Sequence, residues 1–157
     1  MPMSIRLAVE SDEKIVTTLA SEFSQFGDYV PVFLRMLHRR HPIGYGVGQD
    51  VELFVQLDGT GTTDGFAAVE WHTSHTDIHG IAVHPSSRRR GVAANLLDHV
   101  ARGATASGLR ELRCNTAAQA NPAALGFFTT RGFGVVGQAP FNFPRGQAAV
   151  RLRRRLA

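Results

Sequence analysis

IAVHPSSRRRGVA, residues 81–93, joins a predicted strand over 76–83 to a predicted amphipathic helix over 91–103. At such a corner the first N–H groups of the helix have no partner within it, and the helix dipole adds positive potential. Gly91 keeps the corner free of bulky side chains, and the arginines before it supply charge-assisted contacts to an anion. The segment therefore predicts a phosphate site, although R-x-x-G-x-A alone is a weak signal because arginine runs are usually solvated.

A second informative segment lies about one helix and one strand further along the chain. It reads NPAALGFFTTRGF at residues 121–133. Asn121 is a suitable helix N-cap and Pro122 fits the first helical turn, so we expect a helix over 122–130. Its aromatic pair and the Gly-Phe that follows form the second motif of the chain.

The rest of the chain supplies the other elements of a mixed fold. Helical spacing predicts one helix that begins at Ser11 and another over 32–41. Alternation of apolar residues predicts further strands over 5–9, 51–57, 65–71, 111–115, 134–138 and 147–152. The order is a strand, two helices, three strands, a helix, a strand, a helix and two strands, which predicts a mixed α/β fold in a single domain over 1–157.

The composition is that of a soluble globular protein. The 157 residues are 43% hydrophobic, enough for a core, and the length fits one domain. No apolar run is long enough for a membrane helix, and Arg6 and Glu10 interrupt any signal-peptide core, so we expect a cytoplasmic protein. Cys114 is the only cysteine. It excludes an intrachain disulfide and is expected to be a small buried side chain.

The charge is basic and unevenly distributed. Lysine and arginine number 17 against 13 acids, a formal net charge of +4, and Lys14 is the only lysine. Arginine suits bidentate contact with phosphate. Arginines gather at 88–90 and at 151–155, which favours local sites over a broad nucleic-acid surface. We expect the second group to be the charged outer face of an edge strand.

In this order and spacing the two motifs resemble those of the GNAT superfamily of acetyl-CoA-dependent N-acetyltransferases. The first is similar to the pyrophosphate loop of that family, Q/R-x-x-G-x-G/A, and the second to its asparagine, alanine and aromatic-pair signature. The order of elements fits as well, least closely in the first third of the chain. The resemblance implies an α/β (mixed α+β) fold whose mixed, mostly antiparallel sheet has about six to seven strands and about four flanking helices.

The resemblance also implies acetyl-CoA as cosubstrate and a set of residues that bind it. Backbone groups of Ile81 and Val83, on either side of Ala82, would pair with the pantetheine arm like an added strand. The pyrophosphate would be surrounded by Arg88, Arg89, Arg90, Gly91, Val92, Ala93 and Ala94.

The second motif completes this implied set. Asn121 would hydrogen-bond the pantetheine, Ala124 and Phe127 would pack along it, and Phe128 takes the next position. Arg131 either reaches a phosphate or is a solvated charge at the end of a helix.

The implied reaction is direct attack of a neutral primary amine on the acetyl thioester. A base must take a proton from the amine, and the Val83 N–H is the expected donor to the oxyanion. The usual acid of the family is a tyrosine at the position of Phe128, which has no proton to give. Water, Tyr29 or Cys114 replaces it, or the thiolate leaves unaided, or catalysis is slow. A non-catalytic module that binds acyl-CoA is the alternative function.

The base has two candidates. Residues 77–84, DIHGIAVH, are similar to the strand of arylalkylamine N-acetyltransferases in which two histidines relay the proton. His79 matches one histidine and Asp77 replaces the other on the same strand face, where it would orient His79. The alternative is that His79 is a half-buried polar residue without a catalytic role. Glu70, near the end of the neighbouring strand, is the second candidate base.

Histidines and acids are dense around this strand, which raises the question of a metal. His72, His75, Asp77 and His79 together have the composition of a zinc site. We expect a strand and a turn to scatter them, and we therefore expect no metal.

The sequence does not identify the acceptor. By resemblance its pocket is shaped by residues 23–45 and 140–146, whose aromatic side chains favour an apolar amine but fit core packing equally well. The acidic run over 10–28 would attract a cationic acceptor. A homodimer is implied by family analogy only, and nucleic acid and membrane partners are not expected.

Overall fold

The computed structural model describes residues 3–21, 29–38, 50–117, 122–143 and 147–156. Its helices are α1 (Glu13–Ala20), α2 (Val30–Leu37), α3 (Val92–Ala106) and α4 (Pro122–Thr129), with short 3₁₀ turns η1 (Glu10–Asp12) and η3 (Pro85–Ser87). Its strands are β1 (Ser4–Leu7), β2 (Asp50–Leu57), β3 (Thr63–Trp71), β4 (His75–Val83), β5 (Glu111–Ala117), β6 (Gly134–Phe143) and β7 (Gln147–Arg155). None of the helices among these residues is long and apolar enough to cross a membrane.

The strands form one seven-stranded sheet in the order β1-β2-β3-β4-β5-β7-β6. Only β4 and β5 pair in parallel among these neighbours, with α3 in the connection between them, and the other pairs are antiparallel. The mixed, mostly antiparallel α/β fold predicted from the sequence is confirmed.

The bounds of most elements differ from the predicted ones by one to three residues, for example at β1, which ends at Leu7, and at β7, which runs to Arg155. Two differences are informative. β6 runs to Phe143, although Pro140 suggested an earlier end, because its ladder with β7 is irregular between Gln138 and Asn142. A proline without an N–H is tolerated at such an irregularity on an edge strand. α2 begins at Val30, two residues before the predicted start, and the predicted end at 41 lies outside the described residues.

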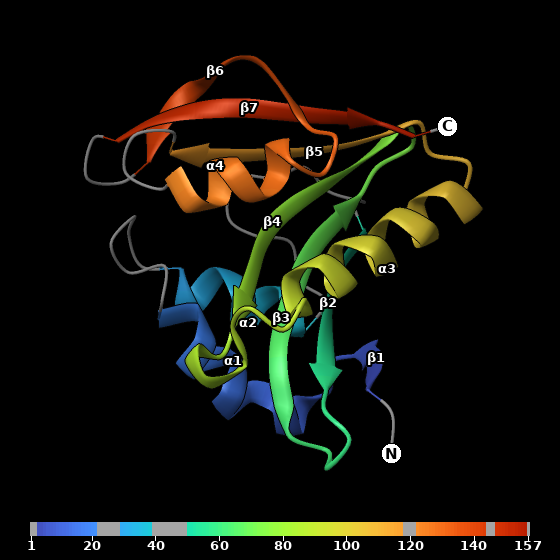
Figure 1. The fold of residues 1–157 in the computed structure, drawn as a ribbon, viewed down its shortest axis with the longest axis vertical. Coiled ribbons are helices and arrows are strands. Elements are labelled where there is room, and N and C mark those ends of the chain that lie inside the picture. The colour runs from blue at the N-terminus through green and yellow to red at the C-terminus, as the bar shows by residue number, and fades with distance from the viewer. Residues whose placement is uncertain (1–2, 22–28, 39–49, 118–121, 144–146, 157) are drawn as a thin grey trace.

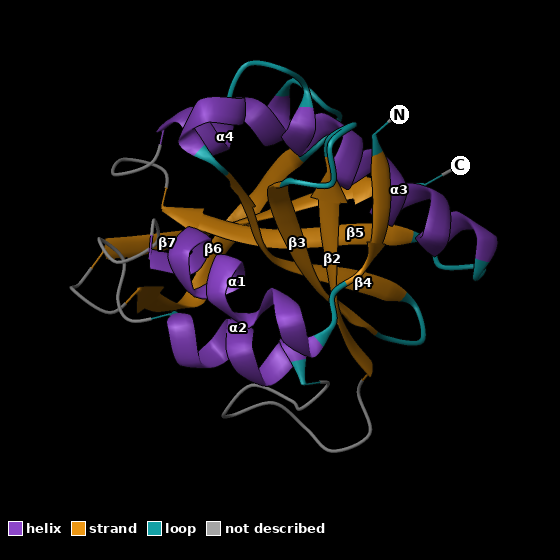
Figure 2. Cartoon of the chain, turned by 90° about the horizontal axis from the view of Figure 1, so that it is seen from below, coloured by secondary structure: helices purple, strands orange, loops and turns teal. Residues whose placement is uncertain are grey.

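Helices cover both faces of the sheet, with α1 and α2 on one face and α3 and α4 on the other (Figure 2). The alternation of β3 divides its side chains between the two layers. Ala67 and Val69 pack with α3, and Phe66 and Ala68 pack with α1 and α2. β3 therefore lies in the middle of the core and fixes the position of β4 beside it.

The sheet opens between β4 and β5. Their parallel ladder covers four pairs, from His75–Glu111 to Ile78–Cys114, whereas β5 pairs with β7 on its other edge over its whole length. Figure 1 shows the two strands diverging from this shared end. The last residues of β4 consequently have β3 on one side and the opening on the other.

Candidate functional site

The corner between β4 and α3 has the backbone conformation that a phosphate loop needs. Arg89 and Gly91 have φ angles of 63° and 78°, both in the left-handed region that favours glycine. Gly91 is the N-cap of α3, and its carbonyl accepts the N–H of Asn95 at 2.9 Å. The first N–H groups of α3, at Val92, Ala93 and Ala94, therefore lie at the open end of a 15-residue helix.

Asp64 and Ser87 anchor this corner, and sequence reasoning missed both. The Ser87 hydroxyl donates to Asp64 Oδ1 at 2.7 Å, and the His84 N–H donates to the Asp64 carbonyl at 2.7 Å. Ser87 is buried although serines are usually exposed. A serine before the arginine run is the only sequence signal for this bond.

The arginines of the loop project from the fold. Arg88, Arg89 and Arg90 are exposed, whereas Val92, the first residue of α3, is buried in the core. The structure thus brings together the predicted pyrophosphate residues 88–94 at one helix end, with three guanidinium groups beside exposed backbone.

The register of β4 sets the direction of its backbone groups. Val83 faces Gly65 and Ile81 faces Ala67, while the His84 N–H bonds Asp64. Hydrogen-bonded and non-hydrogen-bonded pairs alternate in an antiparallel ladder, so the N–H and C=O groups of Ile81 and Val83 point away from β3. They face the opening beside β5, while the buried Ala82 between them bonds β3.

Helix α4 carries the second predicted set of cofactor residues. Arg131 lies with its guanidinium carbon 4.2 Å from the centre of the Phe127 ring and donates to the Phe127 carbonyl at 3.1 Å. Arg131 thus lies where a positive charge interacts favourably with the C-terminal end of a helix, the second of the two roles expected for it. Ala124 is partly buried, and Asn121 lies outside the described residues.

Phe128, at the position where the resembling family has its acid, is part of the core. Its side chain is 9% exposed, and its ring meets Phe127 and Phe133 edge to face with centroids 5.1 Å apart in both pairs. Among the substitute acids, Cys114 is buried, and burial raises the pKa of its thiol. Burial also raises the pKa of Tyr29, whose ring lies 6.2 Å from that of Phe33.

The two candidate bases touch each other. His79 Nε2 lies 2.9 Å from Glu70 Oε1, a hydrogen bond between β4 and β3. The Glu70 side chain is fully buried, and the His79 side chain is 14% exposed. His79 therefore presents the outer part of the pair, with the carboxylate behind it.

A bulge explains this pairing. Ala68 faces Gly80 and Val69 faces Ile78, so His79 is an extra residue in β4. Such a bulge re-aims a side chain and is not visible in the sequence pattern. The carboxylate hydrogen-bonded to His79 is thus that of Glu70, whereas the carboxylate of Asp77, the expected orienting residue, lies beside the ring nitrogens of His72 and His75.

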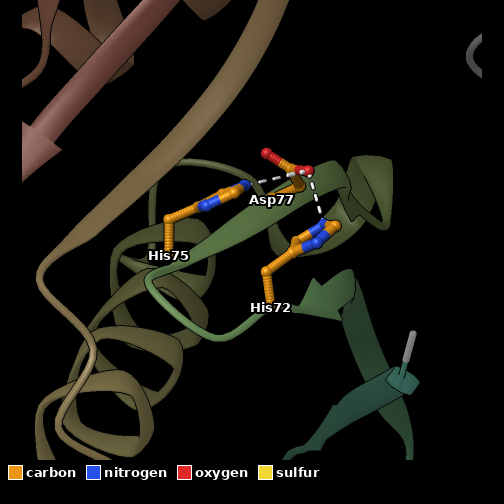
Figure 3. A group of neighbouring side chains, drawn as sticks. All are labelled: His72, His75 and Asp77. Carbon is orange, nitrogen blue, oxygen red and sulfur yellow. Dashed lines mark ion pairs between the residues drawn. The ribbon is translucent and has the colours of Figure 1, made fainter. Parts of the chain in front are cut away.

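His72, His75 and Asp77 form a second polar group at the turn between β3 and β4 (Figure 3). Asp77 Oδ2 lies 2.9 Å from His72 Nε2 and 3.6 Å from His75 Nε2. His72 Nε2 is also 3.5 Å from Glu70 Oε2. The expectation that strand and turn scatter these residues is wrong for the three, because the turn folds His72 back over the strand.

Burial is the main cause that lowers the pKa of His75 in this group. Arg113 and His72 lower it further, while Asp77 opposes the shift. His75 is thus held toward its neutral form, in which a ring nitrogen is an acceptor or a metal ligand.

Comparison with known proteins assigns this architecture to a family. A model of the acetyltransferase (GNAT) family matches residues 11–133. The match includes both motifs, the β4–α3 corner and the His79–Glu70 pair. A search of curated protein sequences gives no match.

Solved structures of acetyltransferases share the fold over essentially the whole chain. Ard1 from Thermoplasma volcanium has a TM-score of 0.82 at 18% identity, covering 100% of this chain and 99% of that one. The ribosomal-protein-S18-alanine N-acetyltransferase from Escherichia coli has a TM-score of 0.76 at 18% identity, covering 99% of this chain and 94% of that one. The PaiA N-acetyltransferase from Thermoplasma acidophilum, solved in complex with coenzyme A, has a TM-score of 0.75 at 14% identity, covering 99% of each chain. At these identities the likeness concerns the fold alone.

Proposed function

Because the chain belongs to the acetyltransferase (GNAT) family, we propose that it transfers the acetyl group of acetyl-CoA to a primary amine of a small molecule or peptide. One observation carries the proposal. The exposed end of α3 and the outward-facing backbone of β4 adjoin each other, so one extended ligand with a diphosphate can contact both. Acetyl-CoA supplies the activated acetyl thioester.

The β4–α3 corner fits a diphosphate. The amide groups of residues 91–94 would donate to its oxygens, and the positive φ of Gly91 lets the backbone approach closely. Arg88, Arg89 and Arg90 would add charge-assisted contacts from outside. Asp64 and Ser87 would hold the loop in place without touching the ligand.

The open edge of β4 fits the pantetheine arm. Ile81 and Val83 would pair with its amides as a strand pairs with a neighbour. Because the arm would run from the corner back along β4, past Val83 to Ile81, the Ile81 N–H would lie nearer the acetyl end and His79. It would therefore be better placed to donate to the oxyanion of the addition step than the Val83 N–H expected from the sequence. Ala124 and Phe127 on α4 would line the same opening.

His79 is the base in this proposal, and Glu70 positions it. A base must reach the amine directly or through one water, and the fully buried Glu70 reaches it only through His79. Glu70 would hold the ring by its 2.9 Å hydrogen bond and stabilise the imidazolium that forms. Water, Tyr29 or Cys114 would return a proton to the leaving thiolate, because Phe128 has none.

The test is amine-dependent release of coenzyme A thiol from acetyl-CoA. A panel of aromatic amines, polyamines, amino acids and peptides with free N-termini covers the acceptor classes. Release with at least one acceptor, together with a product one acetyl group heavier by mass spectrometry, supports the proposal. Binding of acetyl-CoA without release from any acceptor overturns catalysis.

Packing of Phe128 into the core favours a second candidate, a module that binds acyl-CoA without catalysis. It predicts tight binding with no turnover for every acceptor. Phe128→Tyr would place a hydroxyl at the position of the usual acid, and gain of turnover by this variant would show that the missing proton donor is the defect.

Three further properties belong to the same proposal. The chain is proposed to be one domain, to work in the cytoplasm and to form a homodimer, the last by analogy with the family. Light scattering of the purified chain measures the dimer, and a monomer at micromolar concentration contradicts it.

A further inference from the structure

The turn between β3 and β4 brings three potential metal ligands together. In Figure 3 the rings of His72 and His75 lie side by side with nitrogen atoms directed at the Asp77 carboxylate. The three ligand atoms lie within 4.8 Å of one another. Zinc bound tetrahedrally at 2.0–2.2 Å separates its ligand atoms by about 3.3 Å. The observed separations of 2.9 and 3.6 Å from Asp77 Oδ2 lie on either side of that value.

The backbone holds these side chains on one face. His75 and Asp77 are two apart in β4 and therefore point the same way. The His72 N–H donates to the His75 carbonyl at 2.9 Å, which closes the turn and returns His72 to that face. Two ligands thus come from a strand in the middle of a sheet and one from a tight turn.

One buried nitrogen atom of the group lacks a hydrogen bond. Within the described part of the chain, the buried His72 Nε2 has no hydrogen-bond partner, although Asp77 Oδ2 is 2.9 Å away. Buried polar atoms are normally hydrogen-bonded, so such an atom needs an explanation. A cation between the nitrogen and the carboxylate would satisfy both.

The chemistry of the ligands selects the ion. Two imidazoles and one carboxylate suit zinc, whereas calcium and magnesium prefer oxygen ligands throughout. Three protein ligands leave a fourth tetrahedral position for water. The carboxylate of Glu70, 3.5 Å from His72 Nε2, adds negative charge beside the group.

We propose that His72, His75 and Asp77 bind one zinc ion at the β3–β4 turn. The rings are stacked, with centroids 4.4 Å apart and an angle of 11°, so each must turn about its Cβ–Cγ bond for both lone pairs to meet the ion. That torsion is broad and soft in histidine. The bound ion would tie the turn to β4 next to the His79–Glu70 pair. The site does not depend on acetyl transfer.

The test uses untagged full-length protein, stripped with a chelator and dialysed. Titration with zinc in a calorimeter is expected to show one equivalent, and cobalt in its place is expected to give the intense visible absorption of a tetrahedral site. His75→Gln and Asp77→Asn should each weaken zinc binding more than about 100-fold, beyond the 10–100-fold loss typical of a residue that only supports a ligand. His38→Gln, a matched change of an exposed histidine just after α2, should leave binding unchanged.

Three outcomes overturn the proposal. These are no zinc binding by the stripped protein, equal binding by Asp77→Asn and the parent protein, and loss of binding in His38→Gln. Circular dichroism and the melting temperature show whether each variant folds. If a variant does not fold, X-ray absorption of the zinc-loaded parent protein replaces it. Scattering from two imidazoles supports the site, and sulfur ligation or an all-oxygen shell contradicts it.

Discussion

At the scale of single residues, the candidate base depends on one extra residue in a strand. From the sequence, His79 and Glu70 were predicted as alternative bases, and Asp77 was predicted to orient His79. In a strand with regular alternation of side chains, Asp77 and His79 lie on the same face, which supports that assignment. The bulge at His79 breaks the alternation and aims the imidazole at Glu70 instead. Bulges arise from tertiary pairing of two strands, so one strand read alone does not reveal them.

Loss of either member of this pair is expected to reduce turnover rather than cofactor binding. His79→Gln should lower kcat by about 10²–10⁴-fold, because proton removal from the amine is lost. Glu70→Gln keeps a hydrogen-bonding partner but not its charge, so a smaller loss is expected. Steady-state kinetics in chelator-containing buffer measure kcat and the KM for acetyl-CoA. Full turnover in His79→Gln excludes it as the base, and an unchanged pH profile in Glu70→Gln excludes its positioning role.

A second residue-scale prediction concerns stability in acid. Asp12 is buried and accepts hydrogen bonds from Arg6 at 2.7 Å and from the Val9 N–H at 2.8 Å. The hydrogen bond from Arg6 is the main cause that lowers the pKa of Asp12. The pKa of Asp12 is therefore lower in the folded protein than in the unfolded chain, where it is about 3.9. The ionised carboxylate contributes its full stabilisation at pH values above the unfolded pKa. This contribution is lost as the pH falls through the lower pKa of the folded state.

Asp12→Asn should therefore destabilise the protein at pH 7 by about 1–2 kcal/mol, a modest amount because water screens the half-exposed Arg6. The gap between the variant and the parent protein should shrink below about pH 4, the unfolded pKa of an aspartate. Urea denaturation at pH 7, 5 and 3 measures both. A gap of equal size at every pH would show that Asp12 contributes through packing alone.

At the scale of elements, α3 is bounded by two glycines in the same unusual conformation. Gly91 before it and Gly108 after it have φ angles of 78° and 77°, and a Cβ on either would meet nothing within 4 Å. The sequence predicted the start of this helix within one residue, because an arginine and glycine loop after a strand is a strong local signal. It did not predict Asp64 as the anchor of that loop, because the bond to Ser87 spans 23 positions.

The two glycines provide a matched pair of variants. Gly91→Glu and Gly108→Glu impose the same backbone strain, about 1–2 kcal/mol, at opposite ends of a helix about 22 Å long. Only Gly91→Glu places a carboxylate in the proposed diphosphate site, where it repels the ligand. We expect it to weaken acetyl-CoA binding at least about tenfold, equivalent to 1.4 kcal/mol, and Gly108→Glu to leave binding unchanged. Equal affinities in calorimetry would remove residues 91–94 from the cofactor site.

At the scale of the whole molecule, the order of helices and strands followed from the sequence, and the division of the sheet did not. Periodicity predicts each strand because burial imposes it locally. The parting of β4 from β5 after Ile78 and Cys114 depends on how β5 is held along its other edge, where it pairs with β7 over its whole length, and β7 is more than 30 residues further along the chain. Only the resemblance to a family predicted an opening there.

This opening has a measurable consequence for amide exchange. Ile81 and Val83 have N–H groups that face the opening, whereas the intervening Ala82 bonds β3. In the free protein the amide hydrogens of Ile81 and Val83 should exchange with solvent faster than that of Ala82. Coenzyme A paired along β4 should slow the exchange of the Ile81 and Val83 amides by at least about tenfold more than that of the Ala82 amide. The Ala82 amide is the control, because any slowing of its exchange reports the general stabilisation of the protein by the ligand. Residue-resolved exchange followed by NMR separates the three amides. Uniform slowing of all three would mean that coenzyme A binds elsewhere on the fold, and the sheet opening would then be a structural feature without a role in the reaction.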